Sequence, residues 1–142
     1  MKYLFDTDHI SFLQRGTGSE YAALAARLAH HPLTDFTYSV ISFHEQLLGA
    51  HGSINRARTK MDVIRGYNVL LEILQGFMSA PVLPFDTAAS AAFDGLKAQR
   101  LHIATMDLRI AAIALSQGLI VLTRNVRDFG RVPGLLTEDW TV

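Results

Sequence analysis

Residues 105–125 of the chain read TMDLRIAAIALSQGLIVLTRN. Thr105 can cap a helix that runs to a stop at Gly118, and residues 119–122 form the clearest strand of the chain. Because the helix turns tightly into the strand, the two run in opposite directions. The start of the helix, with Asp107, therefore lies at the same edge of the sheet as the end of the strand.

The rest of the chain repeats this alternation of strand and helix. Strands are predicted at residues 2–5, 36–40 and 82–85, with an edge strand at 135–137. Helices are predicted at 19–30, after a Ser42 cap, at 53–79 as one helix or two broken near Gly66, and at 86–101. Strands separated by helices indicate an α/β fold, with a parallel sheet of four to five strands covered by helices on both faces.

Length and composition restrict the class of protein. The chain has 142 residues, of which 49% are hydrophobic and 18% charged, so we expect one globular domain over residues 1–142. There is no cysteine, which excludes disulfides, thiolate zinc sites and a cysteine nucleophile.

Two further features concern location and charge. Asp6 and Asp8 interrupt the apolar run that a signal peptide needs, and we find no apolar window long enough to span a membrane, so we expect a cytoplasmic protein with no membrane partner. The 13 basic residues balance the 13 acidic ones, so a nucleic acid would have to bind a local basic patch.

Acidic and amide side chains follow the strands at one edge of the sheet. Asp6 comes directly after the first strand, Glu45 lies in the first turn of the helix after the second, and Asp107 begins the helix described above. Asn125 and Asp128 follow the strand at 119–122. Ligands bind beyond the carboxyl ends of parallel strands, so this edge is the predicted site.

Carboxylates brought together repel one another unless a cation neutralises them. With oxygen donors and no cysteine, a hard divalent ion such as Mg²⁺ suits the edge better than zinc. Such an ion can polarise a phosphodiester and activate bound water, so the acids predict phosphodiester hydrolysis.

Each residue also has an ordinary structural interpretation. An aspartate after a strand is often a turn or cap residue, Asp8 is typical of a cap for the helical turn after it, and acids are favoured at helix starts anyway. The six histidines show no ligand spacing. Arg56, Arg58, Lys60 and Arg65 are typical of a solvated face, whereas Arg124, Arg127 and Arg131 lie near the acidic edge and could hold a nucleic-acid backbone.

Four segments in this order and spacing resemble a known family, the PIN domain, and within it the toxin ribonucleases of VapBC toxin–antitoxin systems. The segments are residues 4–11 (LFDTDHIS), 42–50 (SFHEQLLGA), 106–112 (MDLRIAA) and 122–129 (LTRNVRDF). The resemblance covers nearly the whole chain and includes the closing Val132-Pro133-Gly134-Leu135 and Trp140.

The resemblance implies a three-layer α/β/α fold and a metal-dependent endoribonuclease that uses Mg²⁺ or Mn²⁺, forms a homodimer and is inhibited by a cognate antitoxin. It assigns Asp6 and Asp107 as metal ligands, Glu45 as the third acid and Thr7 as the hydroxyl beside the first. The family's fourth acid falls on the neutral Asn125, which leaves open whether Asn125 or Asp128 fills that position and whether a second metal binds.

The hypothesis is therefore that water activated at Asp6, Glu45 and Asp107 attacks an RNA phosphodiester, with Asn125 supporting the metal's water shell and Thr7, Arg124 and Arg127 contacting the substrate. Two alternatives stay open. A haloacid-dehalogenase-type phosphatase also begins with an Asp-x-Asp, although Lys97 alone fits its other motifs poorly. A non-catalytic module that binds RNA or protein is the other. An apolar stretch around Tyr67, Leu71 and Leu74 fits either core packing or a dimer or antitoxin surface.

Overall fold

The computed structural model describes all residues from 1 to 142. Five strands form one sheet, β1 (Tyr3–Phe5), β2 (Phe36–Ser39), β3 (Val82–Leu83), β4 (Ile120–Leu122) and β5 (Thr137–Glu138). Their order is β3-β2-β1-β4-β5, and all neighbouring pairs are parallel. The predicted parallel α/β sheet is confirmed, with β5 two residues further along the chain than the edge strand we expected.

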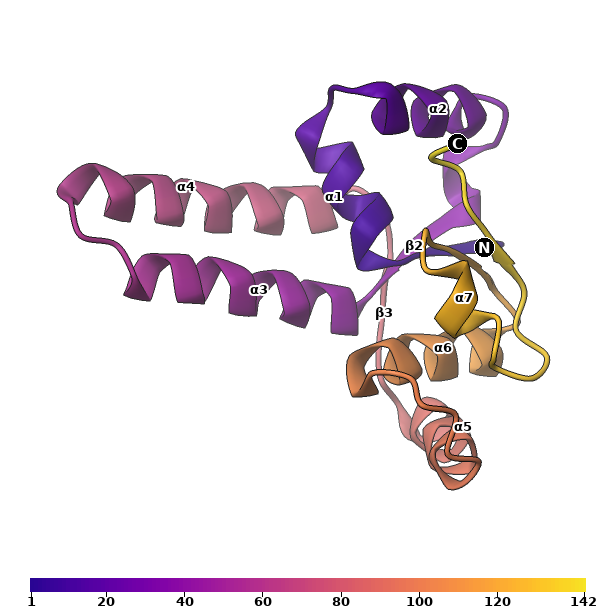
Figure 1. Cartoon of the computed structure of the whole chain (residues 1–142). Coiled ribbons are helices and arrows are strands. Elements are labelled where there is room, and N and C mark those ends of the chain that lie inside the picture. The colour runs from indigo at the N-terminus through magenta and orange to yellow at the C-terminus, as the bar shows by residue number, and fades with distance from the viewer.

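Seven helices connect and cover the strands, α1 (Thr7–Arg15), α2 (Ser19–Leu28), α3 (Val40–Asn55), α4 (Lys60–Phe77), α5 (Thr87–Ala98), α6 (Thr105–Gln117) and α7 (Val126–Phe129). In Figure 1, α1 and α2 lie on one side of the sheet and α5 and α6 on the other, while α3 and α4 run side by side and project away from it. No helix is long and apolar enough to cross a membrane.

The protein has two hydrophobic cores, one on each face of the sheet, and the side chains of β1 point alternately into one and the other. Leu4 faces one cluster, which includes most of α6, whereas Tyr3 and Phe5 face the other, which includes Trp140. Successive side chains of a strand point to opposite faces, so this short strand is buried on both sides. All three of its residues are buried. The three-layer α/β/α arrangement follows directly.

Helix is confirmed over most of residues 53–79, but the break near Gly66 is wrong, because it lies at residues 56–59. The chain leaves the helix after Asn55 and re-enters it at Lys60, because the Thr59 side chain accepts a hydrogen bond from the Asp62 backbone N–H and caps a new helix. Gly66 does not break α4. A Cβ at Gly66 would come within 2.6 Å of Ile54 Cγ1, so the glycine lets α4 pack closely on α3.

Three caps also differ from the prediction. Ser39, not Ser42, caps α3, so the helix starts earlier and Glu45 lies beyond its first turn. Asp6, not Asp8, caps α1 by accepting from the Thr7 backbone N–H. Helix α6 begins at Thr105 after Ala104, which offers no side-chain cap.

Candidate active site

Asp6 is the buried acid at the centre of the site. It follows β1, which has β2 and β4 as its two neighbours, and only 6% of Asp6 is exposed. Its Oδ1 accepts from the Thr7 N–H at 2.8 Å, and its Oδ2 accepts from Thr123 Oγ1 at 2.8 Å. Burial, reinforced by the charge of Asp8, raises the pKa of Asp6 from 3.8 to about 7, against these two hydrogen bonds, which lower it.

Asp107 is the second acid with a raised pKa. It lies in the first turn of α6. Burial, followed by the negative charges of Glu45, Asp128 and Asp8, raises its pKa to about 6. Neither raised pKa has a basic side chain among its causes. The structure thus brings five acids from four segments close enough for their negative charges to raise the pKa of Asp6 or Asp107.

Thr7 joins the end of β1 to helix α3. Its Oγ1 lies 3.0 Å from Glu45 Oε1 and 3.0 Å from Ser42 Oγ. A hydroxyl has a single proton and a carboxylate only accepts, so Thr7 donates to Glu45. Ser42 is fully buried and its backbone N–H donates to Ser39 Oγ, which anchors this chain of hydroxyls in the core.

Thr123 fixes the end of β4 against Asp6. It is fully buried, donates to Asp6, and its Oγ1 accepts from the Asn125 backbone N–H at 2.9 Å. Thr123 is not among the site residues predicted from the sequence. Its position in the sequence could have identified it. A hydroxyl residue directly after a strand that pairs with β1 lies at the same edge of the sheet as the acid that follows β1.

Asp8 connects α1 to the same loop rather than capping a helix. Its Oδ2 accepts from the Arg124 backbone N–H at 2.9 Å, and its Oδ1 lies 2.7 Å from His9 Nδ1. The Trp140 N–H donates to His9 Nε2 at 3.1 Å, so the proton of the neutral imidazole lies on Nδ1 and is donated to Asp8. The buried His9 thereby ties the C-terminal segment to the loop after β4.

Asn125 and Asp128 interact with each other. The Asn125 Oδ1 caps α7 by accepting from the Asp128 N–H, and its Nδ2 donates to Asp128 Oδ2 at 3.1 Å. Only Asp128 of the two adds negative charge that raises the pKa of Asp107. Which of them fills the family's fourth position stays a prediction.

The two predicted substrate-binding arginines differ in their surroundings. The Arg124 guanidinium lies 5.5 Å from the centre of the Phe12 ring and 4.0 Å from Glu20 Oε1, so nearby groups partly engage it. Arg127 is exposed on α7 and makes no ion pair. Arg131, also exposed, pairs with Asp128 at 3.4 Å.

The donor set consists of carboxylate, amide and hydroxyl oxygens. No three histidine or acidic side chains lie close enough together to form a complete cage for a metal ion. The histidines stay outside any ligand group: His9 is committed to Asp8 and Trp140, and His44 is exposed on α3. What the edge can do chemically is attract a cation through one or two carboxylates and leave its other positions to water and substrate.

The known proteins and solved structures that this chain resembles agree with one another. No family model matches the chain. The chain is 40% identical to the tRNA(fMet)-specific endonuclease VapC of Shigella flexneri, in a match that spans 50% of this chain and 58% of that protein. It is 30% identical to Ribonuclease VapC1 of Haemophilus influenzae strain R2866 over 99% of both chains. The solved structure of VapBC-1 from nontypeable Haemophilus influenzae superimposes with a TM-score of 0.77 and 25% identity over the full length of both chains.

Proposed function

This chain belongs to the VapC ribonucleases of toxin–antitoxin systems, and from that premise we propose that it hydrolyses RNA phosphodiesters at its acidic edge in a Mg²⁺-dependent reaction. The observation that supports the proposal most is the pair of carboxylates formed by the buried Asp6 and the half-buried Asp107, whose pKa values rise to about 7 and about 6. A bound divalent cation would offset both causes of these raised pKa values, the burial of the carboxylates and the negative charge of their neighbours.

The residues present fit Mg²⁺. This ion prefers oxygen ligands, keeps several water molecules and commonly binds through one or two carboxylates plus substrate phosphates. An edge of oxygen donors without a three-carboxylate cage suits that mode of binding. Asp6 and Asp107 would hold the ion; Mn²⁺, with similar preferences, is the alternative. When bound, the ion supplies charge that polarises the phosphodiester and lowers the pKa of water.

The other residues orient and support the reaction. Glu45 orients the attacking water or accepts its proton, and Thr7 holds the Glu45 carboxylate through its 3.0 Å hydrogen bond. Thr123 holds Asp6 in a single orientation. Asn125 supports the water shell beside Asp128, and the exposed Arg127, with Arg124, contacts RNA phosphates.

The name of the Shigella relative suggests tRNA as the substrate class. The solved relative is a VapBC complex, so we propose a cognate antitoxin as the partner. An apolar hollow of about 370 Å³ between α3 and α4 would receive it, lined by Phe43, Leu47, Tyr67, Leu70, Leu71 and Leu74. Tyr67, Leu71 and Leu74 are each more than half exposed, as unpartnered binding surfaces often are. A homodimer and a cytoplasmic location stay predictions.

Family membership separates the chain from haloacid-dehalogenase-type phosphatases. The non-catalytic alternative is tested directly. Purified protein free of antitoxin is incubated with total tRNA in Mg²⁺ or in EDTA, and cut ends are sequenced. We expect cleavage in Mg²⁺ only, and a loss of at least about a hundredfold in Asp107→Asn. Equal cleavage by a folded Asp107→Asn variant would contradict the assignment, and no cleavage by the parent would favour a binding module.

A further inference from the structure

The far end of the α3–α4 arm carries a cluster of exposed cations. We call Arg56, Arg58, Lys60 and Arg65 the arm-tip cluster. These four cations fall within ten residues that contain a single acid, Asp62, although basic and acidic residues balance over the whole chain. The excess of positive charge is therefore local. If these residues only formed a solvated face, there would be no reason for four cations to lie so close together.

A single ion pair at the tip leaves three of the four cations without an acidic partner. Arg65 Nη1 lies 3.4 Å from Asp62 Oδ1, and both side chains are largely exposed. No salt bridge involves Arg56, Arg58 or Lys60. Lys60 is the first residue of α4, where the helix dipole disfavours a cation. Local helix stability thus does not account for the charge.

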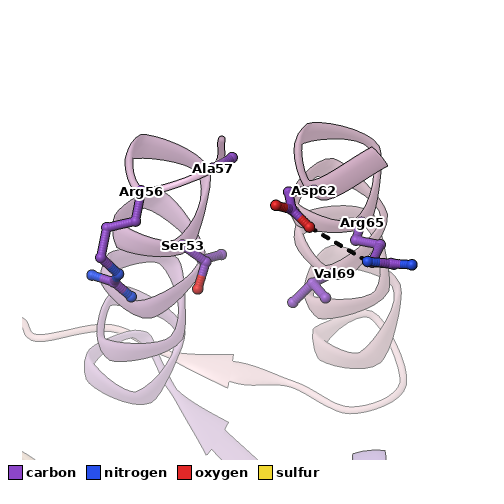
Figure 2. A pocket seen from close by; sticks show the side chains of 8 residues that line it. Ser53, Arg56, Ala57, Asp62, Arg65 and Val69 are labelled. Atoms are coloured by element: carbon purple, nitrogen blue, oxygen red, sulfur yellow. Dashed lines mark hydrogen bonds and ion pairs between the residues drawn. The ribbon is translucent and has the colours of Figure 1, made fainter. Parts of the chain in front are cut away.

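Two members of the cluster, Arg56 and Arg65, line a hollow of about 330 Å³ between the two helices, and Arg58 and Lys60 lie in and beside the short connection at its outer end. Figure 2 shows Ser53 of α3 and the Asp62 and Val69 side chains of α4 on the sides that face each other, whereas Arg56, at the end of α3, and the guanidinium of Arg65 extend outward on either side. The lining therefore combines two guanidinium groups and a hydroxyl, which are groups that bind phosphate and sugar in nucleic acids, with one carboxylate, Asp62, that is paired with Arg65.

The arm-tip cluster lies well away from the acidic edge. Arg56, which follows the last residue of α3, lies eleven positions after Glu45, which is about 16 Å along a helix. RNA phosphates approach an acidic edge against electrostatic repulsion, so positive charge elsewhere on the surface must supply affinity. A strand of RNA that reaches both places extends over several nucleotides.

We propose that the arm-tip cluster binds the phosphate backbone of the RNA substrate several nucleotides away from the bond that is cut. This rests on the proposed ribonuclease function. It makes long or folded RNA a better ligand than a short oligonucleotide, because only the longer RNA contacts both the acidic edge and the tip of the arm.

The test measures binding, so that it does not depend on cleavage. Asp107→Asn protein, with and without Arg58→Gln/Lys60→Gln, is titrated with fluorescent total tRNA and with a fluorescent pentanucleotide. The matched control is Lys97→Gln/Arg100→Gln, which removes two exposed cations from the far end of α5 and the loop after it. Circular dichroism and thermal unfolding show whether each variant is folded.

We expect the arm-tip variant to lose about tenfold in the ratio of tRNA affinity to pentanucleotide affinity near 0.15 M salt. Its plot of log affinity against log salt concentration should be less steep by about 1.5, as for two lost phosphate contacts. The control should change the ratio less than twofold, and Arg58→Lys, which keeps the charge, should resemble the parent.

Equal losses in the arm-tip and control variants, or no loss in either, would overturn the proposal. A polyglutamate peptide is the probe for the competing acidic-protein partner: weaker peptide binding with unchanged tRNA binding would also overturn it. If the parent binds tRNA through the cluster but cuts no RNA, the proposed function fails and the arm-tip site stands.

Discussion

Thr123 Oγ1 donates a hydrogen bond to Asp6 Oδ2 across 2.8 Å, although 117 positions of sequence separate the two residues. The contact joins the ends of the parallel neighbours β1 and β4. It orients the most buried acid of the site and stabilises its charged form, which burial alone would disfavour. The ability of Asp6 to ionise therefore depends on a hydroxyl from the other end of the chain.

Replacement of Thr123 by valine tests this contact. The variant keeps the shape of the side chain but removes the donor, so the pKa of Asp6 should rise beyond about 7 and less of it should be ionised at neutral pH. We expect kcat/KM for RNA at pH 7 to fall about tenfold and to recover partly as the pH rises. Thr123→Ser keeps the hydroxyl and is the control; an unchanged pH profile in Thr123→Val would contradict the role.

The stability of the metal-free protein should fall as the pH rises. The pKa values of Asp6 and Asp107 are raised in the folded state, so between about pH 4 and pH 7 the folded protein binds more protons than the unfolded chain. The two protonated carboxyl groups contribute fully to the free energy of unfolding below pH 3.8, the pKa in the unfolded chain. This contribution is lost as the pH rises through their pKa values in the folded protein, about 6 for Asp107 and about 7 for Asp6. Asp6 contributes a loss of about 2–4 kcal/mol.

Urea unfolding in EDTA at several pH values measures this dependence. Asp6→Asn should flatten it and should be more stable than the parent at pH 8, because the amide cannot ionise. Added Mg²⁺ should stabilise the parent at pH 8 more than at pH 5, because the ion competes with protons for the same carboxylates. A parent whose stability increases from pH 5 to pH 8 in EDTA would contradict the raised pKa values of Asp6 and Asp107.

Replacement of Asn125 by aspartate adds an acid at the position where the family resemblance predicts one. In this chain it would also exchange the 3.1 Å hydrogen bond from Asn125 Nδ2 to Asp128 for repulsion between two carboxylates. We expect the free energy of unfolding in EDTA to fall by about 1 kcal/mol, and Mg²⁺ to recover most of the loss. Asn125→Ala, which removes the hydrogen bond without adding charge, should not be rescued by Mg²⁺.

Two glycine-to-alanine substitutions should change the free energy of unfolding in opposite directions. Gly66→Ala places a Cβ 2.6 Å from Ile54 Cγ1 in the contact between α3 and α4, and we expect it to destabilise the protein by about 1–3 kcal/mol. Gly95→Ala, inside α5 with nothing within 4 Å of the new Cβ, should stabilise it by about 0.5–1 kcal/mol. Chemical denaturation measures both, and a stabilised Gly66→Ala protein would mean that the arm can move apart at little cost.

Much of the fold could be predicted because it depends on local patterns. The apolar run after Gly118 and the periodic helix before it indicate strand and helix without any distant contact, and their order gives the parallel sheet. The boundary between α3 and α4 could not be read in this way. Apolar spacing continues across it, and the Thr59 cap competes with helix continuation in a manner that periodicity does not reveal.

The sequence by itself determined the inventory of the site: oxygen donors, no thiols, and acids placed after strands that must end at one edge. The tertiary structure alone decided which of these groups became buried, because burial depends on what the neighbouring elements place over each carboxylate. Thus Asp6 is covered and held by Thr123, Asp8 is occupied by His9 and the Arg124 N–H, and Asn125 is paired with Asp128. Desolvation and Coulomb repulsion act through space, so residues far apart in the chain set the protonation of these acids.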